Sequence, residues 1–235
     1  MYSKQALSGD LSFKDLFRLI KFNKAERLRN PDFFHPSGSI CFCGPQGSGK
    51  TLSAVKYVEY LHKAYPKALI VSNLKLNFCD YLPYQGFSDN DKHSYPYALE
   101  NLNNGEFGVI VLIDEVQTEF SSLDSLKLSP SVLNIICQQR KRRFHLVLTS
   151  QLFTRIAKAY REQISAAVDC SCLLGSIQRL QVIDFARCAY DIEGNLTSVA
   201  YSKQYFWTRS PRLYSLYDTS EIISRVSRSD VLKGR

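Results

Sequence analysis

A short segment in the first quarter of the chain has the residue types and spacing of a phosphate-binding loop. Its glycines let the backbone curl so that N–H groups point inward, and a following helix N-terminus adds partial positive charge. In such loops the lysine reaches the β- and γ-phosphates and the hydroxyl residue ligates Mg²⁺. The segment therefore predicts a P-loop that binds ATP and Mg²⁺. Every required position of G-x-x-x-x-G-K-[ST] is matched by Gly44, Pro45, Gln46, Gly47, Ser48, Gly49, Lys50 and Thr51.

Two acidic residues directly follow a continuous apolar run. The run Val109–Ile113 predicts a central strand of a parallel sheet, and Asp114 and Glu115 come next. Because ligands bind at the carboxyl ends of parallel strands, we expect Asp114 to complete the Mg²⁺ site beside Thr51. An acid in the position of Glu115 can polarise the water that attacks the γ-phosphate. The alternative is that both acids cap the next helix.

A third apolar run also ends in polar residues. His145–Thr149 predicts a buried strand, which Ser150 and Gln151 follow. If this strand is inserted between those that carry Lys50 and Asp114, the Gln151 side chain can touch the γ-phosphate or the attacking water. That arrangement is typical of the additional-strand branch of P-loop ATPases. The alternative is that Gln151 is an exposed loop residue.

A run of four cations, Arg140 to Arg143, lies just before this third strand. Such runs are usually solvated faces that keep a protein soluble. At this edge of the sheet, however, a neighbouring subunit in a ring could present its nucleotide. One of these arginines could then act in trans on the phosphates. A third interpretation is direct contact with DNA phosphates.

The elements around these motifs alternate between strand and helix. Helices are predicted at Thr51–Ala64 and Pro130–Gln139. The alternation predicts an α/β fold in which helices flank a parallel sheet and the crossovers are right-handed. The four predicted strands are Ser39–Cys43, Ala68–Ser72, Val109–Ile113 and His145–Thr149.

Two appendages extend this α/β core. Apolar and basic residues alternate at helical spacing over Ser12–Arg29, which predicts a basic amphipathic helix within an N-terminal segment, residues 1–36. This helix could contact a membrane protein, a lipid surface or DNA, or it could cover the edge of the core. At the other end, Leu180–Ala189 and Thr197–Phe206 predict a β-hairpin. We assign residues 37–235 to one ATPase domain that includes this hairpin.

Composition narrows the partners and the compartment. A formal net charge of +8 and a pI near 9.1 favour an anionic partner such as DNA. The seven cysteines lack paired zinc-binding spacing, which predicts reduced thiols and a cytoplasmic location. Cys41 and Cys43 are expected to be small buried residues on one face of a strand. The longest apolar run falls well short of the roughly 20 residues of a membrane span, so none is expected.

Several of these segments together resemble the zonular occludens toxin family, the filamentous-phage assembly ATPases within the FtsK and HerA translocase superfamily. The stretch from Arg140 to Gln151 is similar to the translocase segment of an arginine, a turn and a strand that ends in Gln. More particular are three short segments: Ser72-Asn73-Leu74, Ile113-Asp114-Glu115-Val116-Gln117 and Leu216-Tyr217-Asp218-Thr219. The resemblance implies nucleotide roles for Lys50, Thr51, Asp114, Glu115 and Gln151, and it makes Arg140 the matching candidate finger.

The motifs and the resemblance together predict an ATP-hydrolysing motor that packages viral DNA or drives phage assembly and export. The expected assembly is a homo-oligomeric ring, a hexamer, with non-specific DNA contacts. A membrane-associated or capsid assembly partner is also expected. The rivals are a small-molecule kinase, a nucleotide-dependent switch and a scaffold that binds partner proteins without moving DNA. Glu115 beside Asp114 argues against the kinase, which needs no water-activating acid.

Overall fold

The structure is a computed structural model that describes residues 21, 25, 30–84, 95–119, 138–156, 158–191 and 196–218. The chain divides into two compact units, Met1–Phe33 and Phe34–Arg235. In the first unit, Lys21 and Ala25 are helical. The rest of the predicted basic helix lies outside the described residues. All helices and strands below belong to the second unit.

An eight-stranded sheet runs through the second unit in the order β10-β7-β6-β1-β5-β4-β2-β3. Each neighbouring pair from β6 to β3 is parallel, whereas β7 pairs with β6 and β10 in antiparallel fashion. Strand β5 separates β1 from β4, which confirms the predicted additional-strand order. The strands are β1 (Gly38–Cys43), β2 (Leu69–Ser72), β3 (Leu82–Pro83), β4 (Val109–Ile113), β5 (Phe144–Ser150), β6 (Ala166–Leu173), β7 (Ile177–Ile183) and β10 (Tyr201–Thr208).

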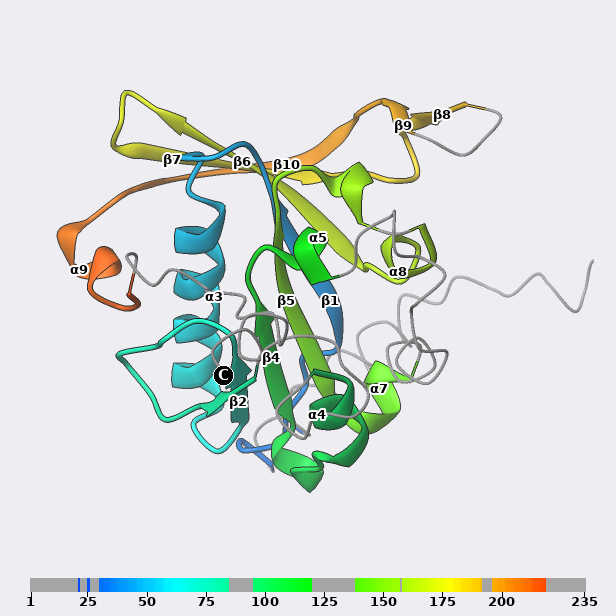
Figure 1. Cartoon of the computed structure of the whole chain (residues 1–235). Helices are drawn as coiled ribbons and strands as arrows, with labels where there is room; N and C mark the ends of the chain where they lie inside the picture. Colours follow the sequence, from blue (N-terminus) through cyan, green and yellow to red (C-terminus); the bar gives the residue numbers. More distant parts are fainter. Residues whose placement is uncertain are drawn as a thin grey trace, which may run out of the picture. The chain divides into compact units, whose positions relative to one another are not determined.

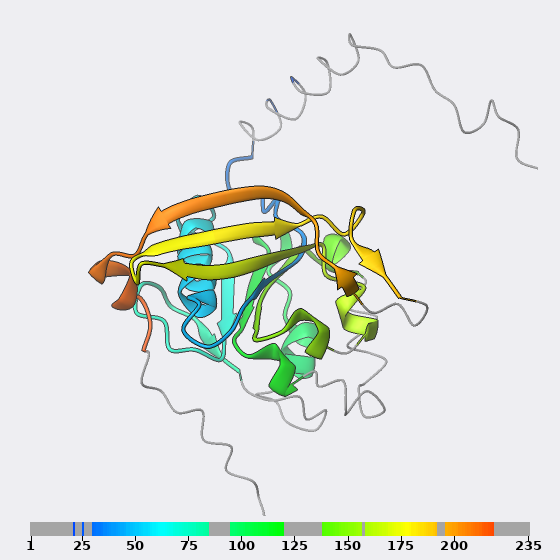
Figure 2. The ribbon, with the colours of Figure 1, turned by 90° about the horizontal axis from the view of Figure 1, so that it is seen from above.

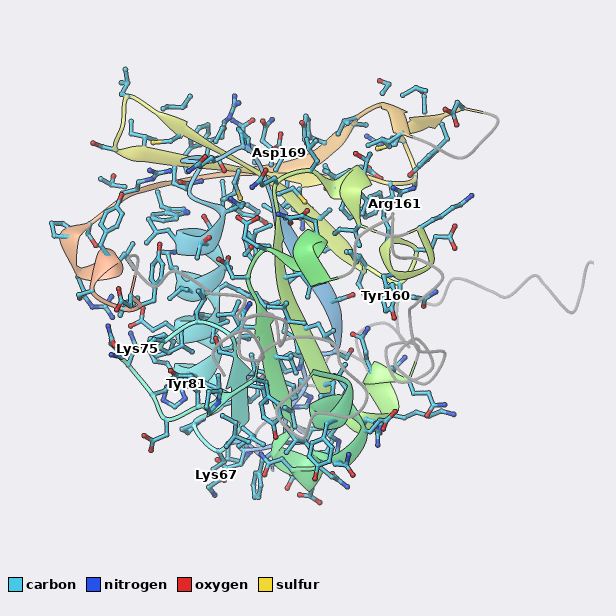
Figure 3. The ribbon with its side chains drawn as sticks, in the orientation of Figure 1. Lys67, Lys75, Tyr81, Tyr160, Arg161 and Asp169 are labelled. Atoms are coloured by element: carbon cyan, nitrogen blue, oxygen red, sulfur yellow. The ribbon has the colours of Figure 1, made fainter. Side chains whose placement is uncertain are left out.

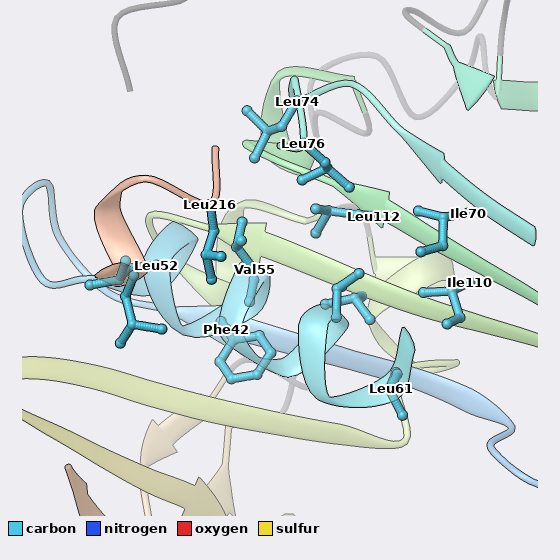
Figure 4. Packing of buried hydrophobic residues seen from close by; sticks show 14 of the residues in the cluster. Phe42, Leu52, Val55, Leu61, Ile70, Leu74, Leu76, Ile110, Leu112 and Leu216 are labelled. Atoms are coloured by element: carbon cyan, nitrogen blue, oxygen red, sulfur yellow. The ribbon is translucent and has the colours of Figure 1, made fainter. Parts of the chain in front are cut away.

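Alternate residues of the central strands enter two separate hydrophobic clusters. In β4, Ile110 and Leu112 join one cluster, while Val109, Val111 and Ile113 join the other. Side chains alternate across a strand, so a sheet that is covered on both faces buries every position. All residues of β4 and β5 are buried accordingly. The first cluster is shown in Figure 4, where residues of α3 (Lys50–Ala64) meet those of β2 and β4.

Different helices cover the two faces (Figure 1). Helix α3 and the short α9 (Pro211–Tyr214) pack on one face, where Leu213 joins the α3 cluster. The other face carries α8 (Lys158–Arg161), whose Tyr160 and Arg161 are labelled in Figure 3. The remaining short helices are α4 (Tyr95–Asn101), α5 (Val116–Glu119), α7 (Gln139–Arg142) and the 3₁₀ turns η1 (Gly105–Phe107) and η3 (Phe153–Arg155). No helix among the described residues is long and apolar enough to cross a membrane.

The C-terminal strands form a curved antiparallel ribbon, β6-β7-β10 (Figure 2). A separate small hairpin, β8 (Ala189–Tyr190) with β9 (Leu196–Ser198), connects β7 to β10 and confirms the predicted hairpin. The long strands differ from their predicted bounds. The strand predicted at Leu180–Ala189 corresponds to β7, which begins at Ile177 and ends at Ile183. Strand β6 was not predicted as a separate element. Most of the predicted helix Pro130–Gln139 lies outside the described residues.

Candidate nucleotide-binding site

The predicted phosphate loop connects β1 to α3 and lies at the carboxyl ends of β1 and β5. The Gly44 N–H donates to the Ser150 carbonyl at 3.2 Å, so the loop starts from the end of the neighbouring strand. Gly47 and Gly49 adopt φ angles of 77° and 85°, a left-handed region that favours glycine. The Ser48 hydroxyl is buried and has no hydrogen-bond partner in the described part of the chain. A phosphate oxygen would satisfy this donor.

The two predicted Mg²⁺ ligands contact each other. The Thr51 hydroxyl donates to Asp114 Oδ1 at 2.9 Å, and the Thr149 hydroxyl donates to the same oxygen at 2.6 Å. Burial raises the pKa of the Asp114 carboxyl, while the hydrogen bonds from Thr149 and Thr51 act in the opposite direction. Oxygen donors of this kind suit Mg²⁺, which keeps waters and binds few protein ligands. The residues therefore fit a magnesium ion held with the nucleotide phosphates.

Asn73 holds the end of β4 in place. Its amide N–H donates to the Asp114 carbonyl at 3.0 Å, and its oxygen accepts from the Asp114 backbone N–H at 2.8 Å. The Glu115 N–H donates to the Thr149 hydroxyl at 2.8 Å. Neither Asn73 nor Thr149 was among the predicted site residues. Asn73 lay in a segment that was noted for its family resemblance, but its contacts with a strand 41 residues away leave no local pattern.

Glu115 lies beside the P-loop lysine. Lys50 Nζ is 2.9 Å from Glu115 Oε1, and the Gln117 amide donates to the other carboxylate oxygen. The Gln117 side chain also accepts from the Gln151 N–H at 3.3 Å, which brings the end of β5 to the same place. Glu115 has a φ of 55°, a left-handed conformation that is uncommon outside glycine. Such backbone strain clusters at functional sites.

The basic run is divided between structural and exposed positions. Arg142 donates to the Leu99 and Glu100 carbonyls at 2.5 and 2.9 Å, and Arg143 donates to the Gly105 carbonyl at 3.3 Å. Arg140 is exposed on α7. Helix α7 precedes β5, whereas the phosphate loop and Gln151 lie at the opposite end of that strand. Arg140 is therefore not part of the site in its own chain.

Three segments that were not predicted as site residues reach the phosphate loop and its surroundings. Leu216–Asp218 pairs with the residues after β2, through an antiparallel bridge between Leu76 and Tyr217. Burial, followed by the nearby Asp114 charge, raises the pKa of Tyr217 to about 12. Gln178 of β7 and Arg209 after β10 contact the loop itself. The Leu-Tyr-Asp segment thus lies next to the Ser-Asn-Leu segment, although they are far apart in sequence.

Comparison with known proteins decides the family. The model of the family described as "Zonular occludens toxin (Zot)" matches residues 39–220, most of the chain. The chain belongs to the Zot family. The resemblance predicted from the sequence is confirmed. A search of curated proteins finds no significant match.

One solved structure, the N-terminal domain of a zonular occludens toxin, agrees with the Zot assignment at the level of the fold, and two others are less similar. The N-terminal domain of zonular occludens toxin from Neisseria meningitidis is 18% identical, with a TM-score of 0.56; the match covers 78% of this chain and 100% of that domain. The genome packaging NTPase B204 of Sulfolobus turreted icosahedral virus 2, in complex with AMP, is 15% identical, with 60% and 78% covered and a TM-score of 0.44. B204 of Sulfolobus turreted icosahedral virus is 19% identical, with 60% and 76% covered and a TM-score of 0.42.

Proposed function

We propose that this Zot-family chain hydrolyses ATP with Mg²⁺ and uses the energy to move viral DNA, in packaging or in phage assembly and export. One observation carries the proposal. Lys50 and Thr51 begin α3 after β1, Asp114 and Glu115 directly follow β4, and the two pairs meet at the carboxyl ends of these strands in an additional-strand sheet. This combination supplies a phosphate loop, a metal site and a water-activating acid in one place.

The residues take separate roles in this proposal. Gly44–Thr51 holds the phosphates, and Thr51 and Asp114 hold the Mg²⁺ ion. When bound, the ion neutralises charge on the phosphate oxygens. Glu115 takes a proton from the attacking water. Gln151, fixed through Gln117, orients that water or senses the γ-phosphate.

The Lys50–Glu115 ion pair joins the proposed base to the proposed phosphate-binding lysine. The carboxylate is 2.9 Å from the lysine nitrogen that the phosphates would also bind. A triphosphate would therefore compete with Glu115 for the lysine. In the proposal, Glu115 leaves Lys50 when the nucleotide binds and becomes available to the water. Nucleotide binding and the activation of the base are then one event.

Arg140 and the net charge support the wider assembly. Arg140 is exposed at the end of the sheet opposite to the nucleotide site, and we propose a hexameric ring in which it contacts the neighbour's phosphates. The net charge of +8 favours DNA as a non-specific partner. We place the ring in the host cytoplasm, with a membrane-associated or capsid protein as its docking partner.

Turnover and DNA binding test the proposal together. Purified protein should release phosphate from ATP only with Mg²⁺, and added DNA should increase the rate. DNA affinity should fall steeply as salt rises, because cationic contacts release counterions. Turnover that DNA does not affect would favour a nucleotide-dependent switch. Binding of ATP without any turnover would favour a scaffold, and the absence of ATP binding would refute the proposal.

A further inference from the structure

The carbonyl side of the phosphate loop is held by two side chains of the C-terminal ribbon. Gln178 is fully buried, and its amide N–H donates to the Ser48 carbonyl at 2.9 Å. Its side-chain oxygen accepts from Nε and Nη2 of Arg209 at 3.0 and 2.7 Å. Arg209 Nη2 also lies 3.4 Å from the Gly47 carbonyl. The two side chains therefore bind consecutive carbonyl groups of the loop.

These contacts supply hydrogen-bond donors that the carbonyl groups of a phosphate loop need. A phosphate loop turns its N–H groups inward to the ligand, so several of its carbonyl groups lack the partners that a helix or strand would give them. A buried carbonyl that has no hydrogen-bond donor destabilises the loop conformation. Gln178 supplies one such donor, and its own oxygen is satisfied by Arg209. The three groups form a closed chain of hydrogen bonds from the ribbon to the loop.

The close approach also explains the glycine at position 49. A Cβ atom on Gly49 would lie 2.2 Å from Gln178 Oε1 and 2.3 Å from Arg209 Nη2. At Gly47, by contrast, a Cβ atom would meet nothing within 4 Å. A side chain at position 49 would therefore displace the Gln178 and Arg209 groups that hold the loop, and it would also strain the left-handed backbone. Gly47 is required for its backbone conformation alone.

The pairing of β7 with β10 sets the position of both side chains. Gln178 is opposite Trp207 in the antiparallel register, and the Arg209 N–H donates to the Ser176 carbonyl at 2.8 Å. Arg209 therefore follows the end of the ribbon, whose outer strand β10 is exposed along nearly all its length. A change in the ribbon would move the two donors relative to the loop.

We propose that Gln178 and Arg209 are positioning residues that hold the phosphate loop in its nucleotide-binding shape and couple nucleotide affinity to the β7–β10 ribbon. The proposal rests on the proposed nucleotide site, and it assigns the pair no contact with the reacting atoms. Coupling of this kind is reciprocal, so bound nucleotide also stabilises the ribbon. The ribbon becomes a regulatory element of the ATPase site.

Nucleotide titration of full-length variants tests the pair. Gln178→Ala and Arg209→Ala should each raise the Kd for both ATP and ADP about tenfold, the loss expected for one hydrogen bond to the loop. The effects of the two changes should be less than additive in the double variant, because the residues act through one chain of bonds. Turnover at saturating ATP should stay within about threefold of wild type. Arg209→Lys keeps the charge but not the paired N–H groups, so it should restore only part of the affinity.

Arg179→Ala is the matched control. Arg179 is also an arginine of the ribbon, and its Nε donates to the Ser171 hydroxyl at 2.9 Å. This variant should bind ATP and ADP as wild type does. Thermal unfolding without nucleotide shows which variants fold. If Gln178→Ala does not fold, the Arg209→Ala variant still tests the proposal, because Arg209 is only half-buried.

Three results would overturn the inference. The first is a lower melting temperature with unchanged nucleotide affinity, which would indicate a purely structural role. The second is a loss of turnover of 100-fold or more with unchanged ADP affinity, which is the behaviour of a group that contacts the γ-phosphate. The third is wild-type affinity in both variants, which refutes the pair while the proposed function stands. Wild-type protein that binds no nucleotide would refute the proposed function first.

Discussion

Replacement of Glu115 by glutamine should separate ATP binding from ATP hydrolysis, and binding should improve. Glutamine keeps the size of the side chain but removes the negative charge that lies 2.9 Å from Lys50. ATP would then no longer compete with a carboxylate for the lysine. The same change removes the proton acceptor for the attacking water. The affinity and the rate should therefore move in opposite directions.

The size of the binding effect follows from the exposure of the ion pair. The Lys50 side chain is 8% exposed and the Glu115 side chain is 26% exposed. A charged hydrogen bond is worth about 1.5–3 kcal/mol when well shielded. Solvent around Glu115 screens the pair, which leaves about 1 kcal/mol. We therefore expect Glu115→Gln to bind ATP about fivefold more tightly and to turn over about 10²- to 10⁴-fold more slowly.

A fluorescent ATP analogue measures the affinity, and phosphate release measures the turnover. Lys50→Ala serves as the variant that loses binding. Glu100→Gln, the same charge change on the exposed surface of α4, serves as the matched control and should resemble wild type. If Glu115→Gln loses affinity as Lys50→Ala does, the competition between Glu115 and the nucleotide is refuted. If its turnover stays within about tenfold of wild type, Glu115 is not the base.

Three further predictions concern the frame of the site, its pH response and its neighbours. Asn73→Ala removes two hydrogen bonds to the Asp114 backbone and should destabilise the protein by about 2–3 kcal/mol in urea unfolding; a loss below about 0.5 kcal/mol would contradict the role of Asn73. Burial lowers the pKa of His145 from 6.5 to about 4, so folding stability should fall by about 3 kcal/mol as pH drops through that window. His145→Leu should lose this component, and parallel curves for the two proteins would refute it. Mixed Arg140→Ala and Lys50→Ala subunits should recover turnover that neither shows alone, because one keeps an intact site and the other keeps the finger. Hetero-oligomers that form without recovery would refute a trans role for Arg140.

The site could be predicted where its chemistry is local in sequence. The phosphate loop is a contiguous segment, and Asp114 and Glu115 directly follow an apolar run, so strand and ligand are read together. The additional strand was predictable because a polar residue, Gln151, directly follows β5, as Asp114 directly follows β4. Residue types and strand ends were sufficient for these features.

The supporting residues could not be predicted because they act through the backbone of distant segments. The Gln178 amide meets a carbonyl 130 residues away, and any donor of the right length could do this. Asn73 likewise holds the backbone of Asp114, and the residues around these two positions give no sign of the contact. The ribbon strands were located only approximately because they are partly exposed, and their hydrophobic alternation is correspondingly weak.

The strand order has a consequence for biosynthesis. Strand β1 lies between β5 and β6, and Cys41 pairs with Leu148 and Ala167, more than 100 residues later in the chain. Ribosomes add about 5–20 residues per second, so β1 waits roughly 6–25 s for both partners. During that interval an apolar segment stays unpaired, and non-local parallel pairing is slow to form. We expect production of this protein to depend on chaperones and to improve when translation is slowed at low temperature.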